Sequence, residues 1–365
     1  MWDVTEEILE ALEIGAGILG TGGGGNPYLG KVEALQQLRA GKTIRVVSLD
    51  EVADDAFTTT VGGMGSPTVG IERIGRGDEC IRAMRALERH MGREFTHVIP
   101  GEIGGSNSMR PMIVAARVGV PVIDGDGMGR AFPELQMDTF SIYGVAPTPG
   151  ALADPRGHEV IFDKIDDPAT LERYARAVTI QMGGAAGYAF PPMTGAEVKR
   201  TAIPGTVTLA VEIGRAVRRA RAALRNPVDA ALSVSGGKRL FHGKIVDVER
   251  RLLGGFARGV LDLEGSGPDA GRSLRIDFQN ENLIARTEEG EILAVVPDLI
   301  CLVDEDSAEP VTTEIVRYGL RVVVLGIPAP ELLKTAESLA VVGPAAFGYG
   351  DVVYVPLAGV FGQAG

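Results

Sequence analysis

Cysteine and histidine are scarce in this chain. Its 365 residues include two cysteines, Cys80 and Cys301, and four histidines that stand singly. Two cysteines so far apart in sequence fit neither a disulfide framework nor the ligand spacing of a zinc ribbon, and they favour a reducing compartment. The residues offer no Ser-His-Asp arrangement and no reactive-cysteine signature.

Long apolar runs and an excess of basic residues are also missing. No run approaches the ~18 apolar residues of a membrane span, and the first residues carry Asp3, Glu6 and Glu7 where a signal peptide would be basic. The net charge of −12 argues against nucleic acid or an anionic membrane as the main partner. We therefore expect a cytoplasmic enzyme or binding protein for a small molecule.

Glycine is abundant: 50 of the 365 residues, about twice the usual ~7%. The densest run, GAGILGTGGGGNPYLG at 15–30, contains a literal GxGxxG at Gly20, Gly22 and Gly25. Dinucleotide binding needs a strand before this motif, whereas Thr5 and an apolar stripe at helical spacing predict a helix there. The run is then either a left-handed helix stop with a tight loop, or a binding loop whose amides form an anion or oxyanion nest.

Two regions of different pattern follow one another. The length exceeds the roughly 250–300 residues at which single cores stop growing, so two domains are expected. Residues 1–167 predict an α/β domain that carries the glycine-rich and acidic loops. Residues 168–365 predict a long helix at about 206–225 and a β-rich domain at about 237–328, where the apolar period becomes two. The expected fold is an N-terminal layered α/β sandwich with a second, barrel- or sandwich-like β domain.

A compact βαβ unit is predicted from the strand at 96–99, the helix at 108–118 and the strand at 120–124. Because such crossovers are right-handed, both strands would be parallel and would end at the same sheet edge. Glu102 and Asp124 follow these strands, and ligands of open α/β sheets bind at this edge. It is the best site location that the pattern offers.

The other expected elements are local. Helices are predicted at 29–40, 78–91 and 168–181, and strands at 44–48 and 57–61. Gly62 to Gly65 is expected to form a turn, and the chain around Pro191 and Pro192 a loop.

Acidic loops supply the candidate chemistry. Asp124, Asp126, Arg130 and Glu134 fall within eleven residues, and like charges held close raise one pKa and create a matched acid and base. The same carboxylates suit magnesium or calcium better than zinc, and an Asx-turn network is the structural alternative. Glu102 has no evident packing role, and an exposed loop acid is its structural alternative.

Polar amides accompany these acids. Asn107, in the loop after Glu102, is either a helix cap or a substrate contact. Asn280 and Asn282 lie in DFQNENL, at 277–283, which is either a hairpin turn or a set of paired donors and acceptors for a cyclic amide or imide.

Several long motifs occur in an order that resembles the S-methyl-thiohydantoin desulfurase family. They are GILGTGGGGNPYLG, GEIGGSNS, DGDGMGRAFPELQM, MTGAEVKR, DFQNENLIA, VPDLI and RYGLRV. The resemblance runs from about Ile8 to Tyr354. It implies an α/β domain joined to a β-rich domain, and hydrolysis of an S-methylated thiohydantoin to methanethiol and a hydantoin. Many relatives look like companions of ATP-dependent hydantoinase or oxoprolinase subunits.

The residue inventory is compatible with that reaction, which needs a base for water and an acid for a ring nitrogen but no redox cofactor. We assign Asp124 or Asp126 as base and Glu102 or Glu134 as acid, and a divalent metal among these acids stays open. The expected substrate contacts are Asn107, Arg130, Asn280, Asn282 and the amides of Gly22, Gly23, Gly24 and Gly25.

Two alternatives stay open beside the hydrolase. The chain could be a non-catalytic or accessory subunit of a hydantoinase or oxoprolinase, or a nucleotide-binding enzyme that uses the glycine-rich loop. A homo-oligomer is expected in each case.

Overall fold

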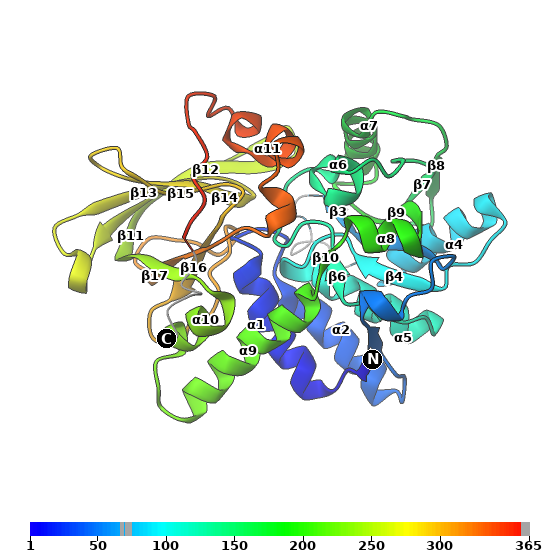
Figure 1. Ribbon diagram of the computed structural model, residues 1–365, viewed down its shortest axis with the longest axis horizontal. Coiled ribbons are helices and arrows are strands. Elements are labelled where there is room, and N and C mark those ends of the chain that lie inside the picture. The colour runs from blue at the N-terminus through cyan, green and yellow to red at the C-terminus, as the bar shows by residue number, and fades with distance from the viewer. Residues whose placement is uncertain (66–68, 70–74, 359–365) are drawn as a thin grey trace.

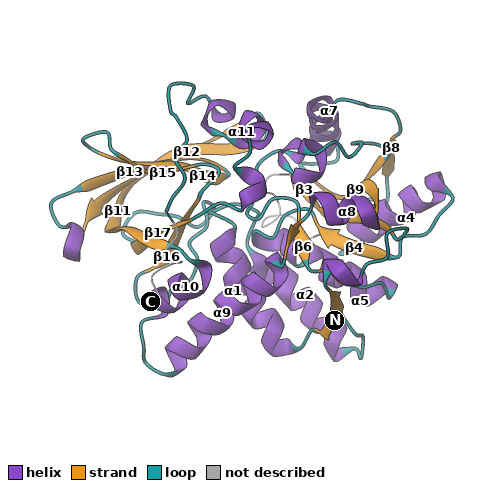
Figure 2. Cartoon of the chain, in the orientation of Figure 1, coloured by secondary structure: helices purple, strands orange, loops and turns teal. Residues whose placement is uncertain are grey.

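The computed structural model describes residues 1–65, 69 and 75–358 and contains two large sheets with helices packed around them (Figures 1 and 2). The helices are α1 (Glu6–Leu19), α2 (Pro27–Arg39), α4 (Glu79–Met91), α5 (Arg110–Val118), α6 (Thr139–Ile142), α7 (Pro168–Gln181), α8 (Gly195–Thr201), α9 (Thr206–Ala222), α10 (Pro227–Ser235) and α11 (Ala336–Val342). The helices predicted at 29–40, 78–91, 168–181 and 206–225 are confirmed as α2, α4, α7 and α9, with ends shifted by up to three residues.

The first sheet has eight strands in the order β1-β2-β5-β4-β3-β9-β7-β8. They are β1 (Trp2–Asp3), β2 (Arg45–Val47), β3 (Phe57–Gly65), β4 (His97–Pro100), β5 (Val122–Ile123), β7 (Gly150–Ala153), β8 (Glu159–Phe162) and β9 (Ala185–Thr194). β4 and β5 run parallel with Val98 opposite Val122, and α5 connects them, which confirms the predicted βαβ unit. Their carboxyl ends therefore lie side by side.

The second sheet has seven strands, all paired antiparallel, in the order β15-β14-β13-β12-β11-β17-β16. They are β11 (Lys238–Leu253), β12 (Phe256–Gly265), β13 (Ser273–Gln279), β14 (Glu281–Thr287), β15 (Ile292–Val295), β16 (Leu299–Asp304) and β17 (Arg321–Ile327). The predicted fold class, α/β followed by all-β, is confirmed.

Helix α1 lies below both sheets in the view of Figure 1. Thr5 caps it by accepting a hydrogen bond from Ile8 N (3.3 Å), as the sequence predicts. It packs unusually close to α9: a Cβ on Gly15 would lie 1.8 Å from Ala210 O, and one on Gly214 would lie 1.8 Å from Ala11 O. Only glycine permits this approach of the two helices.

Two sequence expectations for the first sheet are wrong. Gly62 to Gly65 forms the end of strand β3 and not a turn, because it pairs antiparallel with Tyr188 to Ala185. The chain at Pro191 and Pro192 belongs to β9, and the irregularity between Thr59 and Val61 admits these prolines. Because β9 follows residue 168 and still joins the first sheet, that sheet draws strands from both sides of the predicted 167/168 boundary, which stays a prediction.

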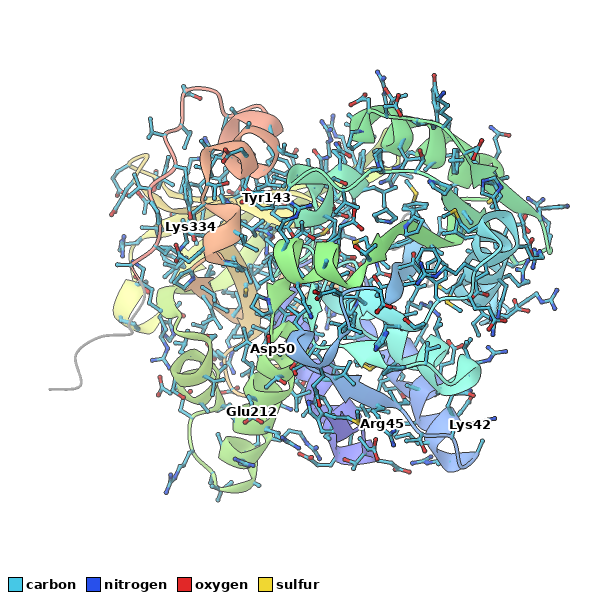
Figure 3. The ribbon with its side chains drawn as sticks, turned by 45° about the vertical axis from the view of Figure 1, so that its right-hand side comes forward. Lys42, Arg45, Asp50, Tyr143, Glu212 and Lys334 are labelled. Atoms are coloured by element: carbon cyan, nitrogen blue, oxygen red, sulfur yellow. The ribbon has the colours of Figure 1, made fainter. Side chains whose placement is uncertain are left out.

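Contacts between the two parts fix their arrangement. Tyr143, beyond α6, donates a hydrogen bond to Leu332 O (2.6 Å), and its hydroxyl also lies 2.9 Å from Thr335 Oγ1 before α11. Figure 3 shows Tyr143 near Lys334 of this later segment. A short two-stranded sheet pairs β6 (Gly125–Asp126) with β10 (Ile203–Pro204). No helix in the described part of the chain is both long and apolar enough to cross a membrane.

Candidate active site

The glycine-rich run after α1 lies at the meeting point of three segments. Gly24 O accepts a hydrogen bond from Ser106 N (2.9 Å), Gly22 O from Thr313 N (2.8 Å), and Thr21 O from Asn282 N (2.8 Å). Gly20, at the end of α1, is right-handed (φ −65°), and the chain first enters the left-handed region at the next residue, Thr21 (φ 52°). The run thus contacts segments that each stand more than eighty residues away from it in sequence.

The glycine-rich run and the loop at Gly104 can approach each other closely because their glycines have no side chains. A Cβ on Gly104 would lie 2.7 Å from Gly20 Cα, and one on Gly24 would lie 2.4 Å from Gly104 O. Gly23 N donates to Gly20 O (2.8 Å), and the Gly24 amide faces the carboxyl of Glu281. Amides of Gly23 and Gly24 therefore serve the protein itself, and a role of Gly22 and Gly25 toward a substrate stays a prediction.

Glu102 follows β4 at the carboxyl edge of the first sheet and is buried. Its Oε1 accepts a hydrogen bond from Asn107 Nδ2 (2.5 Å) and its Oε2 one from Phe132 N (3.3 Å). Burial raises its pKa to about 8, and these hydrogen bonds only partly oppose that effect. Glu102 can therefore hold a proton at neutral pH.

Asn107 links Glu102 to the surface. Its Oδ1 accepts from Gly63 N (2.7 Å), and its Nδ2 also donates to Gly63 O (3.2 Å). Asn107 is half-buried and Gly63 is exposed, so the buried carboxyl lies one side chain away from solvent.

Glu281 is the site residue that sequence reasoning missed. It begins β14 and is buried with 2% of its surface exposed, and a Cβ on Gly23 would lie 1.9 Å from its Oε1. Burial, followed by the negative charge of Glu102, raises its pKa well above 4.5, while Arg130 and the Gly24 amide oppose the rise. The available signal was an acid placed between two asparagines, Asn280 and Asn282, in the segment DFQNENLIA.

Arg130 is fully buried and donates five hydrogen bonds. The acceptors are Ala131 O, Pro297 O, Asp298 O, Thr21 Oγ1 and Asn282 O, at 2.9–3.2 Å. Every N–H of the guanidinium is thereby committed to the protein. The structure places Arg130 beneath the site as a connector of the two sheets, without a donor left for the predicted substrate contact.

Asp126 is buried behind the Glu102 loop. Its Oδ2 accepts hydrogen bonds from Ile103 N (2.7 Å), Met128 N (3.1 Å) and Gly129 N (2.8 Å). Burial raises its pKa to about 7, against the effect of these amides. Its geometry holds the Glu102 loop against the following loop.

Asp124 and Glu134, the other predicted acids, have local partners. Asp124 is half-buried and accepts from Thr208 N (3.0 Å) and Thr208 Oγ1 (2.5 Å), so it caps α9. Glu134 accepts from the side-chain amide of Gln136. Neither is shown in contact with Glu102.

The two asparagines predicted to contact the substrate, Asn280 and Asn282, form side-chain hydrogen bonds with backbone groups. Asn280 is left-handed (φ 57°), and its Oδ1 accepts from Ala257 N (2.9 Å), which joins the turn between β13 and β14 to strand β12. Asn282 Nδ2 donates to Ile300 O (2.8 Å), and its buried Oδ1 has no hydrogen-bond partner. A ring contact from either residue stays a prediction.

Within residues 1–65, 69 and 75–358, no group of three or more His, Cys, Asp or Glu side chains is placed to hold a metal ion. The divalent metal that the sequence leaves open therefore has no ligand set among these residues.

Similarity to known proteins agrees with this geometry. Residues 7–164 match the N-terminal domain and residues 166–357 the C-terminal domain of S-Me-THD-like proteins. The chain belongs to the S-methyl-thiohydantoin desulfurase family. The resemblance stated from the motifs is thereby confirmed.

The crystal structure of a protein from Chromobacterium violaceum is similar to this desulfurase-family member over almost the whole length of the chain. It is 27% identical with a TM-score of 0.79, and the alignment covers 98% of this chain and 100% of that one. Its description gives no activity. No curated protein matches the chain.

Glu102 and Glu281 together form the chemically distinctive part of the site. Burial and the negative charge of Glu102 raise the pKa of Glu281, and Arg130 opposes the rise at both carboxyls. Glu281 lies against Gly23 of the glycine-rich run. Both carboxyls therefore keep their protons to higher pH than a free glutamic acid, and Glu102, with a pKa of about 8, can give and take back a proton near neutral pH.

Proposed function

We propose that this protein hydrolyses an S-methylated thiohydantoin ring, releasing methanethiol and leaving a hydantoin. Family membership supports the ring chemistry. The observation that carries the proposal is that Glu102 and Glu281 are both buried, Glu102 bound by Asn107 and Glu281 set against Gly23 of the glycine-rich run. Pairs of carboxyls with raised pKa are how proteins obtain acid and base catalysis near pH 7.

Glu102 is the proton-transfer residue of this proposal. The ring carbon that bears sulfur is amidine-like and is attacked by water once its neighbouring nitrogen receives a proton. Protonated Glu102 gives its proton to that nitrogen, and the carboxylate so formed takes one proton from the attacking water. This leaves a neutral tetrahedral carbon that carries hydroxyl, methylthio and ring nitrogen.

Collapse of that carbon completes the reaction. The carbon–sulfur bond breaks with its electron pair on sulfur, the hydroxyl proton passes to the sulfur, and the carbonyl of the hydantoin forms. One water is consumed and one methanethiol leaves, with no electron acceptor needed. Asn107, which donates to Glu102 Oε1 at 2.5 Å, holds the carboxyl in place.

The purified chain alone tests the proposal. Incubation with S-methyl-thiohydantoins, followed by thiol-reactive detection of methanethiol and chromatography of the hydantoin, is expected to show both products in equal amounts. An accessory subunit would give neither product until a hydantoinase partner is added. A nucleotide-binding enzyme would instead be stabilised against heat by ATP or NAD, and we expect no such stabilisation.

A further inference from the structure

The side-chain amide of Asn107 is bound by two other residues of the protein. Its Oδ1 accepts a hydrogen bond from Gly63 N (2.7 Å), and its Nδ2 donates to Gly63 O (3.2 Å), near the end of β3. Nδ2 also donates to Glu102 Oε1 (2.5 Å). An asparagine amide carries two N–H groups, so each of these two acceptors has a donor of its own. Both donors of Asn107 are therefore used within the protein.

Gly63 decides which end of this amide faces Glu102. A backbone N–H can only donate, so the atom of Asn107 that it meets must be the oxygen. A reversed amide would set Nδ2 against this N–H and would set Oδ1 against two acceptors, Gly63 O and Glu102 Oε1. The amide nitrogen of Asn107 therefore faces Glu102, and Glu102 Oε1 accepts.

The glycine-rich run holds the turn that carries Asn107. This turn is a short 3₁₀ helix at Gly105–Ser108, and Ser106 N within it donates to Gly24 O (2.9 Å). A Cβ on Gly105, which is left-handed (φ 63°), would lie 2.5 Å from Gly24 O. Only glycine permits this approach of the two backbones. Asn107 is thus fixed from the side of its own loop as well as by β3.

The two carboxyl oxygens of Glu102 differ in their partners. Oε1 accepts the short bond from Asn107, whereas Oε2 accepts from Phe132 N at 3.3 Å, which is long for an N–H···O bond. Both donors are neutral and supply no counter-charge, and burial raises the pKa of Glu102 to about 8. In a protonated carboxyl the C=O oxygen is the better acceptor and the O–H oxygen the poorer one. The stronger donor therefore selects Oε1 as the C=O oxygen.

We propose that Asn107 is a positioning residue, which occupies Oε1 and makes Oε2 the oxygen of Glu102 that carries and transfers the proton. The transfer rests on the proposed function: Oε2 gives its proton to the ring nitrogen and then takes one from the attacking water, while Asn107 stays on Oε1. Asn107 touches no substrate in this account, although the sequence left such a contact open. Its effect on the rate comes through Glu102.

The infrared C=O band of protonated Glu102 tests the position of the proton without turnover. It is measured at about pH 6, where the carboxyl is protonated, and is identified by its loss in Glu102→Gln. If Oε1 is the C=O oxygen, Asn107→Ala removes its strongest hydrogen bond, and the band should move to higher wavenumber. A band that stays in place overturns the inference. Asn226→Ala is the matched control, because Asn226 caps α10 and should leave the band unmoved.

A second variant, Asn107→Leu, covers the case in which Asn107→Ala does not fold. Leucine keeps most of the side-chain volume and removes the donor to Glu102. Gly63 is exposed, so its N–H and C=O can bind water in either variant. The band of Glu102 should again move to higher wavenumber, and an unmoved band in folded Asn107→Leu rejects the role of Asn107.

Kinetics separate a positioning residue from a substrate contact. Loss of one hydrogen bond to the acid in Asn107→Ala should lower kcat about ten-fold and leave KM for S-methyl-thiohydantoins within about two-fold. A higher KM with unchanged kcat would show that Asn107 binds substrate, and would overturn the inference. A shifted band together with no methanethiol from the wild type would reject the proposed function, while the proton would still be assigned to Oε2.

Discussion

Two acidic loops follow neighbouring parallel strands, β4 and β5, and end in different surroundings. Glu102 after β4 is buried, bound by Asn107, and carries a raised pKa. Asp124 after β5 is half-buried and caps α9 through Thr208. Position at the sheet edge is shared, so the difference comes from the surroundings of each carboxyl: Glu102 is buried with Asn107 and the Phe132 amide, whereas Asp124 lies at a helix terminus. Burial, more than strand order, distinguishes the Glu102 loop.

The largest expected effect is the loss of activity on substitution of Glu102, which distinguishes its loop from the Asp124 loop. Glu102→Gln keeps the side-chain shape but cannot exchange a proton, so kcat/KM for S-methyl-thiohydantoins should fall about 10²–10⁴-fold. Release of methanethiol is the measurement. Glu13→Gln is the matched control, because burial also raises the pKa of Glu13, which lies in α1 and pairs with Lys31 of α2. An equal loss in both variants would mean that the effect is not specific to the site.

Asp126 should matter for stability more than for proton transfer. Asp126→Ala leaves the amides of Ile103, Met128 and Gly129 without their acceptor, at a cost of about 1–3 kcal/mol for each buried group left unpaired. We expect a loss of at least about 3 kcal/mol in the free energy of unfolding by urea titration. Asp126→Asn retains an acceptor oxygen and should lose less. Wild-type stability of the alanine variant would show that this carboxyl does not hold the loops together.

The pH dependence of stability should carry the signature of Glu102. The unfolded chain releases this proton near pH 4.5, whereas the folded protein keeps it to about pH 8. Between these values the folded state binds more protons, so this contribution is complete below pH 4.5 and is lost as pH rises through 8. Glu102→Gln should make the decline shallower by up to about 1.4 kcal/mol per pH unit. Parallel curves for the two proteins, from urea unfolding at several pH values, would contradict the buried proton.

Asp124→Asn should have the smallest effect. Asparagine also accepts a hydrogen bond from the Thr208 amide, so the free energy of unfolding should change by about 0.5 kcal/mol or less and kcat/KM by less than about two-fold. Thermal unfolding and the methanethiol assay check both. A hundred-fold loss of activity would return Asp124 to the role of base and erase the difference between the two loops.

Local sequence patterns predicted much of the secondary structure. Thr5 caps α1, and the βαβ unit of β4, α5 and β5 follows from strand and helix periods alone. Pairing between distant strands was not visible. The glycines at 62–65 look like a turn until β9 pairs with them, and the prolines of β9 look like a loop until β3 does.

The site, like the fold, could be predicted only where its contacts are local in sequence. Glu102 and Asn107 stand five residues apart in one loop, and their contact follows from local geometry. Glu281 meets Gly23 across more than 250 residues, and only the docking of the two sheets through Arg130 brings them together. Burial also decides which acids titrate near neutral pH, and the sequence around Asp124 and Asp126 does not reveal it.

The pH dependence of methanethiol release by the purified protein tests the central claim most directly. If protonated Glu102 drives the hydrolysis, kcat/KM for S-methyl-thiohydantoins falls as pH rises through about 8, and Glu102→Gln shows only a small residual rate without that fall. A Glu102→Gln variant that releases methanethiol at the wild-type rate with the same alkaline limb would contradict the account.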